Sequence, residues 1–350
     1  MPNMQPDDSK PVLLDADDAV GNMSPARGSF AGPDLSASQI GAFPIALLVL
    51  NAIPGLGFKA IRRLVEAFDG DCTAIWQVDA GKLRNILRPA QLPDLDSVVT
   101  SIQKDFAYHH QFAVTQYEEL IDRNISILPG AVLPASLREL SDPPRWLFVE
   151  GDPRALYQKP AIALVGTRQA TPPGLRATAQ VVEMISAYDI VIVSGLADGI
   201  DAEAHSCSLG VGLTNVAFLG HGINLMLPAA NKVLRERIVN QGGAVASEYL
   251  PGDRYLKQNL VHRNRLQSAL ADLVIPIEAA VQSGTAHTVR FAQQYSRPIA
   301  GISWPGVNGI SETLSSNGYP VFDLSETADR NRFDGMLQSL VAQDCGSEQP

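Results

Sequence analysis

The stretch Ala161-Ile162-Ala163-Leu164-Val165-Gly166-Thr167-Arg168 decides the fold, because a short apolar run ends there in a glycine-bearing turn. A second unit of the same kind follows, in which Ile190-Val191-Ile192-Val193 runs into Ser194-Gly195-Leu196-Ala197-Asp198-Gly199. Each unit leads into a segment with helical patterning. Two successive strand–glycine–helix units predict parallel strands whose carboxyl ends share one crevice.

This crevice is expected to bind an anion. Helix N-termini at the carboxyl ends of parallel strands present unpaired N–H groups and a partial positive charge, which suit a phosphate. Arg168 adds a fixed charge and a planar fork for bidentate contact. We therefore interpret two turns as phosphate-binding, Gly166-Thr167-Arg168 and Ser194-Gly195. The alternative is that their glycines only tighten the turns.

After Ala161 the pattern alternates between strands and helices to about residue 323, which predicts a doubly wound α/β domain. The expected strands are 161–166, 190–194, 215–219, 244–247, 272–277 and 298–303, with a short edge strand near Val321. The expected helices are 174–187, 199–210, 229–241, 259–270 and 285–296. Residues 325–350 hold one weak helix and a polar tail.

The chain before this domain divides into an arm and a helical region. Residues 1–40 are rich in Asp, Pro, Gly and Ser without periodicity, which predicts a disordered acidic arm. Residues 41–125 favour a small helical domain, with a glycine hairpin at Ile53-Pro54-Gly55-Leu56-Gly57. Such a hairpin can point N–H groups at DNA phosphates, or it can be an ordinary packing corner. One helix over 95–120, a strand at 125–128, a proline-rich linker over 129–144 and a strand at 146–149 complete the prediction.

Composition narrows the class of protein. A chain of 350 residues, 45% hydrophobic, can hold two domains. The cysteines Cys72, Cys207 and Cys345 lie far apart with no CxxC pair, so we expect neither a disulfide framework nor a zinc site. No apolar run reaches the roughly 18 residues of a membrane span, and no secretory leader is recognisable, so a cytoplasmic protein is expected.

The net charge of −10 does not exclude nucleic acid, because its distribution is uneven. Residues 1–40 and 321–350 carry −4 each, which leaves −2 for the middle of the chain. Within that middle, Arg254, Lys257, Arg263 and Arg265 oppose only Asp253. This basic run is a candidate DNA contact, although a run of charges can equally be a solvated face.

Several short motifs, in one order along the chain, resemble the DprA (Smf) family of DNA-processing proteins. The resemblance covers roughly residues 43 to 323. The motifs are Gly166-Thr167-Arg168, Ser194-Gly195-Leu196-Ala197-Asp198-Gly199-Ile200-Asp201, Leu219-Gly220-His221-Gly222, Leu227-Pro228-Ala229-Ala230-Asn231, Ser247-Glu248-Tyr249, Arg263-Asn264-Arg265 and Glu278 with Ser283-Gly284-Thr285.

The resemblance implies a helical SAM-like domain followed, over 126–324, by an extended Rossmann-like domain with a mainly parallel sheet. It implies a non-enzymatic, cofactor-free protein that binds single-stranded DNA without sequence preference and protects it. Such a protein forms a homodimer, helps to load a RecA-type recombinase in natural transformation, and needs no membrane.

The resemblance also implies a DNA pocket. In the family it is built from the arginine of the first turn and from a K-x-N-F run, which reads Lys257-Gln258-Asn259-Leu260 here. The lysine is kept and the aromatic residue is not, which predicts weaker binding per nucleotide, because base–aromatic stacking contributes about 1–3 kcal/mol.

Two further groups are candidate phosphate contacts. Ser283, Gly284 and Thr285 resemble an anion-binding nest at a helix N-terminus. Arg263, Asn264 and Arg265 are candidate DNA contacts, with the alternative that the arginines pair with a carboxylate such as Glu248 or Glu278.

Two other functions remain open at this point. The fold is similar to that of LOG-type nucleotide phosphoribohydrolases, but Thr288 stands where their PGGxGTxxE motif ends in glutamate, which argues against hydrolysis. A nucleotide- or DNA-sensing module of a defence system could use the same pocket without loading a recombinase.

Overall fold

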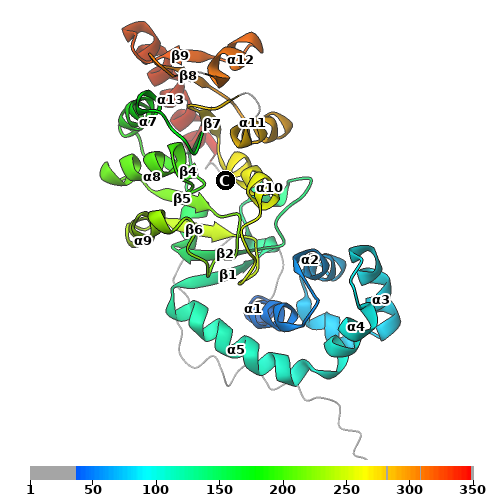
Figure 1. The fold of residues 1–350 in the computed structure, drawn as a ribbon. Helices are drawn as coiled ribbons and strands as arrows, with labels where there is room; N and C mark the ends of the chain where they lie inside the picture. Colours follow the sequence, from blue (N-terminus) through cyan, green and yellow to red (C-terminus); the bar gives the residue numbers. More distant parts are fainter. Residues whose placement is uncertain (1–36, 281–282, 308, 348–350) are drawn as a thin grey trace, which may run out of the picture.

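The structure is a computed structural model that describes residues 37–280, 283–307 and 309–347 (Figure 1). The expected acidic arm therefore lies outside the described residues up to position 36. Helix α1 (Ala37–Ala52) occupies the last residues of the segment predicted to be disordered. None of the helices in the described part of the chain combines the length and the apolar character that a membrane crossing needs.

A seven-stranded sheet forms the centre of the molecule, in the order β1-β2-β6-β5-β4-β3-β7. The five strands from β6 to β7 are parallel, whereas β1 and β2 pair antiparallel at one edge. The mainly parallel, doubly wound fold is therefore confirmed. The strands are β1 (Ile125–Pro129), β2 (Trp146–Gly151), β3 (Ala161–Val165), β4 (Val191–Ser194), β5 (Asn215–Phe218), β6 (Ala244–Ser247) and β7 (Leu273–Pro276).

Helices cover both faces of this sheet, so its central strands are apolar throughout. In β3 every residue is buried, with Ile162 and Leu164 in one core and Ala163 and Val165 in the other. This is the period of two that places alternate side chains on opposite faces. The crossover helices are α7 (Pro172–Ile185), α8 (Ile200–Gly210), α9 (Lys232–Asn240), α10 (Lys257–Leu270) and α11 (Gly284–Gln294), close to the predicted ranges.

The helical region packs against the antiparallel edge of the sheet (Figure 1). Besides α1 it contains α2 (Phe58–Ala67), α3 (Ala80–Leu87), α4 (Leu95–Lys104) and α5 (Phe106–Asp122). The single helix expected over 95–120 is wrong. Asp105, with φ −101° and ψ 16°, ends α4 and begins α5. The helical spacing of apolar residues continues on both sides of Asp105, so the sequence pattern does not indicate that the helix is interrupted there.

One hydrophobic core runs from the helical region into the sheet. It holds Leu47 and Leu50 of α1 together with Phe148 of β2, Ala217 of β5 and Val245 of β6. Those strand residues lie on the sheet face opposite to Leu147, Val216 and Ala246. The helices α1 to α5 therefore share a core with the sheet.

Two segments carry more structure than the sequence pattern indicates. The linker over 129–144 contains the short helix α6 (Ala135–Arg138), and its Leu137 is buried. At the other end of the sheet, β8 (Gly301–Ser303) and β9 (Val321–Asp323) form a separate two-stranded sheet, linked by α12 (Ile310–Ser316). The strand expected over 298–303 therefore lies outside the main sheet, which it meets only at an isolated bridge from Ile299 to Val274 among the described residues.

The expected weak C-terminal helix is in fact a long one, α13 (Thr327–Ser347). Phe333 and Leu337 on this helix are fully buried against the core under β3 and β7. The length of this helix was underestimated because few of its residues are apolar and face the core.

Candidate nucleic-acid interface

A cavity of about 350 Å³ lies at the carboxyl ends of β3, β4 and β5. Arg168 enters it from the turn after β3, Gly195 to Asp198 from the loop after β4, and Leu219 to His221 from the loop after β5. This is the crevice predicted for neighbouring parallel strands. Leu227, Pro228, Tyr255 and Leu260 complete its wall.

The first turn presents one functional side chain to this cavity. A side chain at Gly166 would overlap Ile200 of α8, so glycine lets strand and helix approach closely. The Thr167 N–H donates to the Glu278 carbonyl at 2.7 Å, and the Thr167 carbonyl accepts from the Ile200 N–H at 3.1 Å. Gly166 and Thr167 therefore shape the turn, and Arg168 is its exposed residue, which lines the cavity.

Arg168 is held by a neutral partner. Its Nη1 donates to the Tyr255 hydroxyl at 2.5 Å, and its guanidinium carbon lies 5.8 Å from the centroid of the Tyr255 ring. A guanidinium has five N–H donors, so this contact leaves most of the fork free for an anion. Tyr255 escaped the sequence analysis because it belongs to no periodic element. Its position inside the basic run 254–257 was the available signal.

The second turn is held by buried polar contacts. Ser194 is fully buried, and its hydroxyl donates to the Leu164 carbonyl at 2.6 Å. A side chain at Gly195 would overlap the Arg263 guanidinium and the Asp201 carboxylate. Leu196 adopts a left-handed φ of 55°, and its carbonyl accepts from Asn231 Nδ2 at 3.0 Å. The Ser194 hydroxyl, the Arg263 guanidinium, the Asp201 carboxylate and the Asn231 amide all lie against this loop.

Arg263 lies beneath the cavity and not on its rim. It is 3% exposed, and its guanidinium donates to the carbonyls of Gly195, at 2.8 Å, and of Phe218. Asp201 faces it across Gly195. Burial raises the pKa of the Asp201 carboxyl, against the opposing effect of the Arg263 charge. Arg263, a predicted DNA contact, therefore joins α10 to the ends of β4 and β5 through its Nη1 atom.

Arg265 is also a structural residue. It is 1% exposed and pairs with Glu248 at 2.6 Å, which confirms the alternative that the sequence left open. His262 contacts the same carboxylate at 3.0 Å and Asp142 at 2.8 Å. Burial alone would raise the pKa of Glu248, but Arg265 and His262 outweigh it and lower this pKa to about 2. Asp142 also pairs with Arg62 of α2, so the network ties the helical region to α10.

We call the buried side chains of Asp201, Glu248, Arg263 and Arg265 the buried charge network, and the Asp142 side chain, which is 45% exposed, contacts it through Arg265. Asn264 extends it, since its Nδ2 donates to the Gly284 carbonyl at 3.1 Å.

Ser283, Gly284 and Thr285 mark the start of α11, as predicted. Thr285 is buried, Gly284 is exposed, and the Ser283 hydroxyl is buried and has no hydrogen-bond partner among the described residues. None of the three is among the described residues that line the cavity after β4. The structure therefore separates this turn from the Arg168 cavity.

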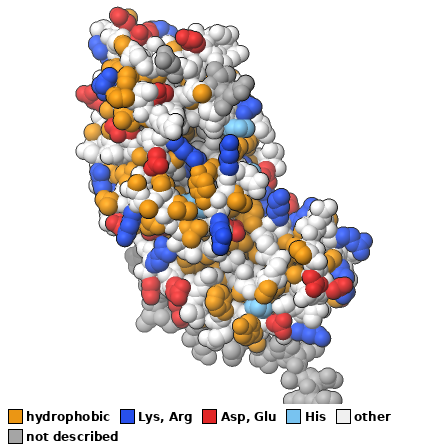
Figure 2. All heavy atoms as spheres, viewed as in Figure 1, with side chains coloured by type: hydrophobic (Ala, Val, Ile, Leu, Met, Phe, Trp, Pro, Cys, Tyr) orange, Lys and Arg blue, Asp and Glu red, His pale blue; other side chains and the backbone are white. Residues whose placement is uncertain are grey.

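The loop before α10 and the helix itself contribute Tyr255 and Leu260 to the cavity lining. Lys257 is the first residue of α10 and is exposed, as is Arg254 in the preceding loop. Leu260 is 8% exposed and closes the cavity floor, packed against Gly220. The Asn259 carbonyl accepts from the Tyr249 hydroxyl at 3.1 Å. We call Arg168, Tyr255 and Lys257 the exposed rim. Lys and Arg side chains lie among hydrophobic ones across the middle of this face (Figure 2).

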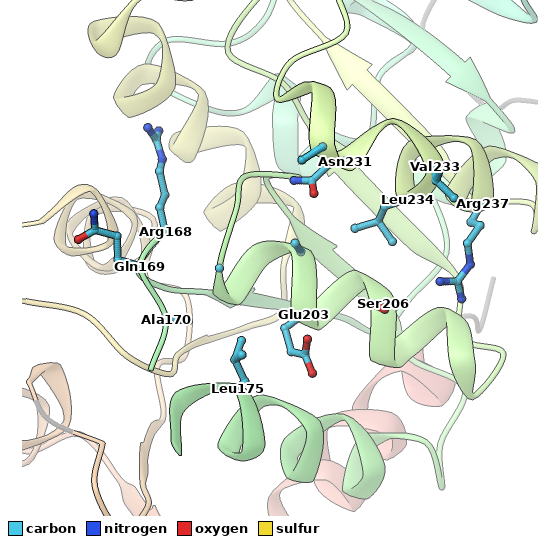
Figure 3. Close-up of a pocket in the computed structure, with 13 residues that line it drawn as sticks. Arg168, Gln169, Ala170, Leu175, Glu203, Ser206, Asn231, Val233, Leu234 and Arg237 are labelled. Atoms are coloured by element: carbon cyan, nitrogen blue, oxygen red, sulfur yellow. The ribbon is translucent and has the colours of Figure 1, made fainter. Parts of the chain in front are cut away.

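A second, more open pocket of about 600 Å³ adjoins the first, and Arg168 borders both. Arg168 and Arg237 stand at opposite ends of it, with Glu203 of α8 between them (Figure 3). Arg168 therefore lies between the cavity and the second pocket and lines both.

Glu278 contacts the start of α7. Its carboxylate accepts from the Thr171 N–H at 2.9 Å and lies against Gly174 in the first turn of α7. A carboxylate at a helix N-terminus is stabilised by the unpaired N–H groups there.

Comparisons with known proteins identify the family of this chain. The family described as DNA recombination-mediator protein A matches residues 124–318, which is more than half of the chain. Protein Smf of Synechocystis sp. is 35% identical over 224 residues, which cover 62% of this chain and 54% of that protein. DNA processing protein DprA of Streptococcus pneumoniae is 36% identical over 179 residues, or 51% and 62% of the two chains. The chain thus spans little more than half the length of these curated relatives.

Solved structures extend the comparison. The X-ray structure of DprA from Streptococcus pneumoniae is similar at a TM-score of 0.60 and 26% identity, covering 80% of this chain and 93% of that one. DNA processing protein A from Helicobacter pylori, described by its single-stranded DNA binding mode, is similar at a TM-score of 0.54 and 27% identity. It covers 61% of this chain and 96% of its own.

Proposed function

Because this chain belongs to the DNA recombination-mediator protein A family, we propose that it binds single-stranded DNA without sequence preference and protects it. In the same proposal it assists the loading of a RecA-type recombinase on strands taken up in natural transformation, inside the cytoplasm and as a homodimer. The observation that supports this most directly is the exposed Arg168 guanidinium at the mouth of a cavity whose strand-end position suits phosphate.

The charges around the cavity favour a polyanion. Arg168 lines the cavity and is exposed, and Arg254 and Lys257 are exposed on either side of the lining residue Tyr255 in the chain. Asp198 is the acidic side chain among the described residues of the lining. Backbone phosphates can be neutralised by such side chains without any contact to base edges, which is the basis of sequence-neutral binding. Arg263 contributes indirectly, because it fixes the carbonyls of Gly195 and Phe218 that shape the cavity.

Two other segments remain proposed contacts. The turn at Ser283, Gly284 and Thr285 presents the N-terminus of α11, and the glycine hairpin between α1 and α2 presents that of α2. We assign both a secondary role beside the exposed rim.

Fluorescence anisotropy tests the proposal. Labelled oligo-dT, a duplex and a labelled mononucleotide are titrated at two salt concentrations with the parent chain and with Arg168→Ala. We expect salt-sensitive binding that prefers the single strand and weakens in the variant. Arg332→Ala removes an equally exposed charge from α13 and serves as the control.

Two results would overturn the proposal. Binding of oligo-dT that is insensitive to both salt and Arg168→Ala would place DNA elsewhere or nowhere on the protein. Binding of the mononucleotide alone would indicate a nucleotide-sensing module that keeps the fold without the strand-binding function.

A further inference from the structure

Tyr255 is an aromatic side chain left exposed beside a cationic one. It lies in the loop that precedes α10, is 43% exposed, and lines the 350 Å³ cavity. Single exposed hydrophobic residues are common and need no function. Tyr255 differs because its hydroxyl and its ring both contact Arg168, which fixes the ring at the cavity mouth.

The other aromatic ring of the cavity is not available to a ligand. His221 is 2% exposed, and its two ring nitrogens contact the carbonyls of Gly222 and Leu227, each at 3.1 Å. Leu260 is buried against Gly220 and offers no planar surface. Among the described lining residues, Tyr255 is thus the one ring that a flat ligand can cover.

The surroundings of the Tyr255 ring suit a nucleobase. Leu227, 39% exposed, and Pro228 line the same cavity and supply apolar contacts. The Arg168 guanidinium lies 5.8 Å from the ring, so a phosphate bound there and the base attached to the same nucleotide can be held together. Stacking on an aromatic side chain tolerates any base, because every base has a π-face.

We propose that Tyr255 stacks on an unpaired nucleobase of the strand whose phosphate Arg168 binds. The inference rests on the proposed function and names the second half of the same site. The Tyr255 hydroxyl orients one edge of the guanidinium, and the remaining N–H groups stay free for phosphate. A duplex, whose bases are already stacked and paired, cannot satisfy both halves, so this site would select single strands.

The decisive experiment compares an ordinary strand with one that has no bases. Oligo-dT and an abasic oligomer of the same length are titrated with the parent chain, Tyr255→Ala and Tyr255→Phe. Removing one stacked base should weaken oligo-dT binding by about 5- to 150-fold in Tyr255→Ala. The abasic oligomer should bind Tyr255→Ala and the parent chain equally, and Tyr255→Phe should restore most of the affinity for oligo-dT.

A spectroscopic signature and a control complete the test. Tyr255→Trp should bind oligo-dT and show fluorescence quenching that the abasic oligomer does not produce. Leu256→Ala changes the adjacent, equally exposed apolar residue and should bind like the parent chain.

The outcomes separate this inference from the function beneath it. Equal weakening of both oligomers by Tyr255→Ala would mean that Tyr255 only positions Arg168, and the stacking proposal would be wrong while DNA binding stood. An unchanged affinity for oligo-dT in Tyr255→Ala would also overturn it. Oligo-dT binding that is insensitive to both salt and Arg168→Ala would instead overturn the proposed function itself.

Discussion

Arginine occurs both in the exposed rim and in the buried charge network, and the surroundings of the arginines differ. Arg168 is exposed and bonded to a neutral tyrosine, whereas Arg265 is 1% exposed and bonded to the Glu248 carboxylate. The charge of the exposed rim can be screened by salt or can pair with an anionic ligand. The charges of the network cannot be removed singly, because each would leave its partner uncompensated in a poorly solvated place.

The comparison teaches that the charge of a segment does not identify its function. Lys257, Arg263 and Arg265 form one basic run in the sequence, yet α10 carries the first to the surface and the other two inward. Substitutions in the buried charge network should therefore lower stability, whereas substitutions in the exposed rim should lower binding.

The largest effect is expected for Arg265→Ala. This variant leaves Glu248 buried opposite no arginine and should lose about 3–5 kcal/mol of unfolding free energy. Arg168→Ala, measured in the same chemical denaturation, should stay within about 0.5 kcal/mol of the parent chain. Similar losses in both variants would erase the distinction between the regions.

Gly195→Ala should have the next largest effect. The new methyl group would overlap both the Arg263 guanidinium and the Asp201 carboxylate, at a cost of about 1–3 kcal/mol for overpacking. Because Gly195 also lines the cavity, oligo-dT binding should fall with stability. Gly210→Ala is the matched control, since a side chain there meets nothing and α8 gains a better helix former. A stable Gly195→Ala chain would show that the layer under the cavity is loosely packed.

The pH dependence of stability should report on Glu248. Its pKa is about 2 in the folded protein against 4.5 ordinarily, so its contribution is complete above about pH 4.5 and is lost as the pH falls toward 2. The limiting slope is about 1.4 kcal/mol per pH unit. Asp142, whose pKa is lowered by His262 and Arg62, acts in the same direction. Urea denaturation of Glu248→Gln should show a shallower decline over this range, and an unchanged slope would contradict the assignment.

The smallest effect belongs to the salt dependence of binding. Arg168→Ala should reduce the slope of log K against log salt for single strands by about 0.7, the value for one phosphate contact. Arg332→Ala, on a distant helix, should leave the slope unchanged. A slope that falls equally in both variants would indicate a diffuse field in place of a defined contact.

Much of the fold was predictable because glycines bound its apolar runs. The strands β3 and β4 and the five crossover helices lie close to their predicted ranges, since each begins or ends at a residue with a local signal. The break at Asp105 was not predictable, because the apolar spacing of α4 continues in α5. Nor was the separation of β8 from the main sheet, because strand partners are set by tertiary packing.

The site was predictable in position and only partly in composition. Arg168 could be identified because it directly follows a strand and a glycine. The burial of Arg263 and Ser194 depends on which strands flank β4, and the order β5-β4-β3 is a property of the assembled sheet. Tyr255 lies inside the basic run, but its contact with Arg168, a residue 87 positions away in the chain, could not be predicted from the sequence.

One hydrophobic core joins Leu47 and Leu50 of α1 to Phe148 and Val245 of the sheet, which couples the unfolding of the two parts. A cut near residue 125, the boundary we propose between the two parts, would leave each half with an uncovered apolar surface. The helices and the sheet are thus expected to unfold in one cooperative calorimetric transition. Replacing the helical half by another domain would also require new side chains on the face of the sheet against which it packs.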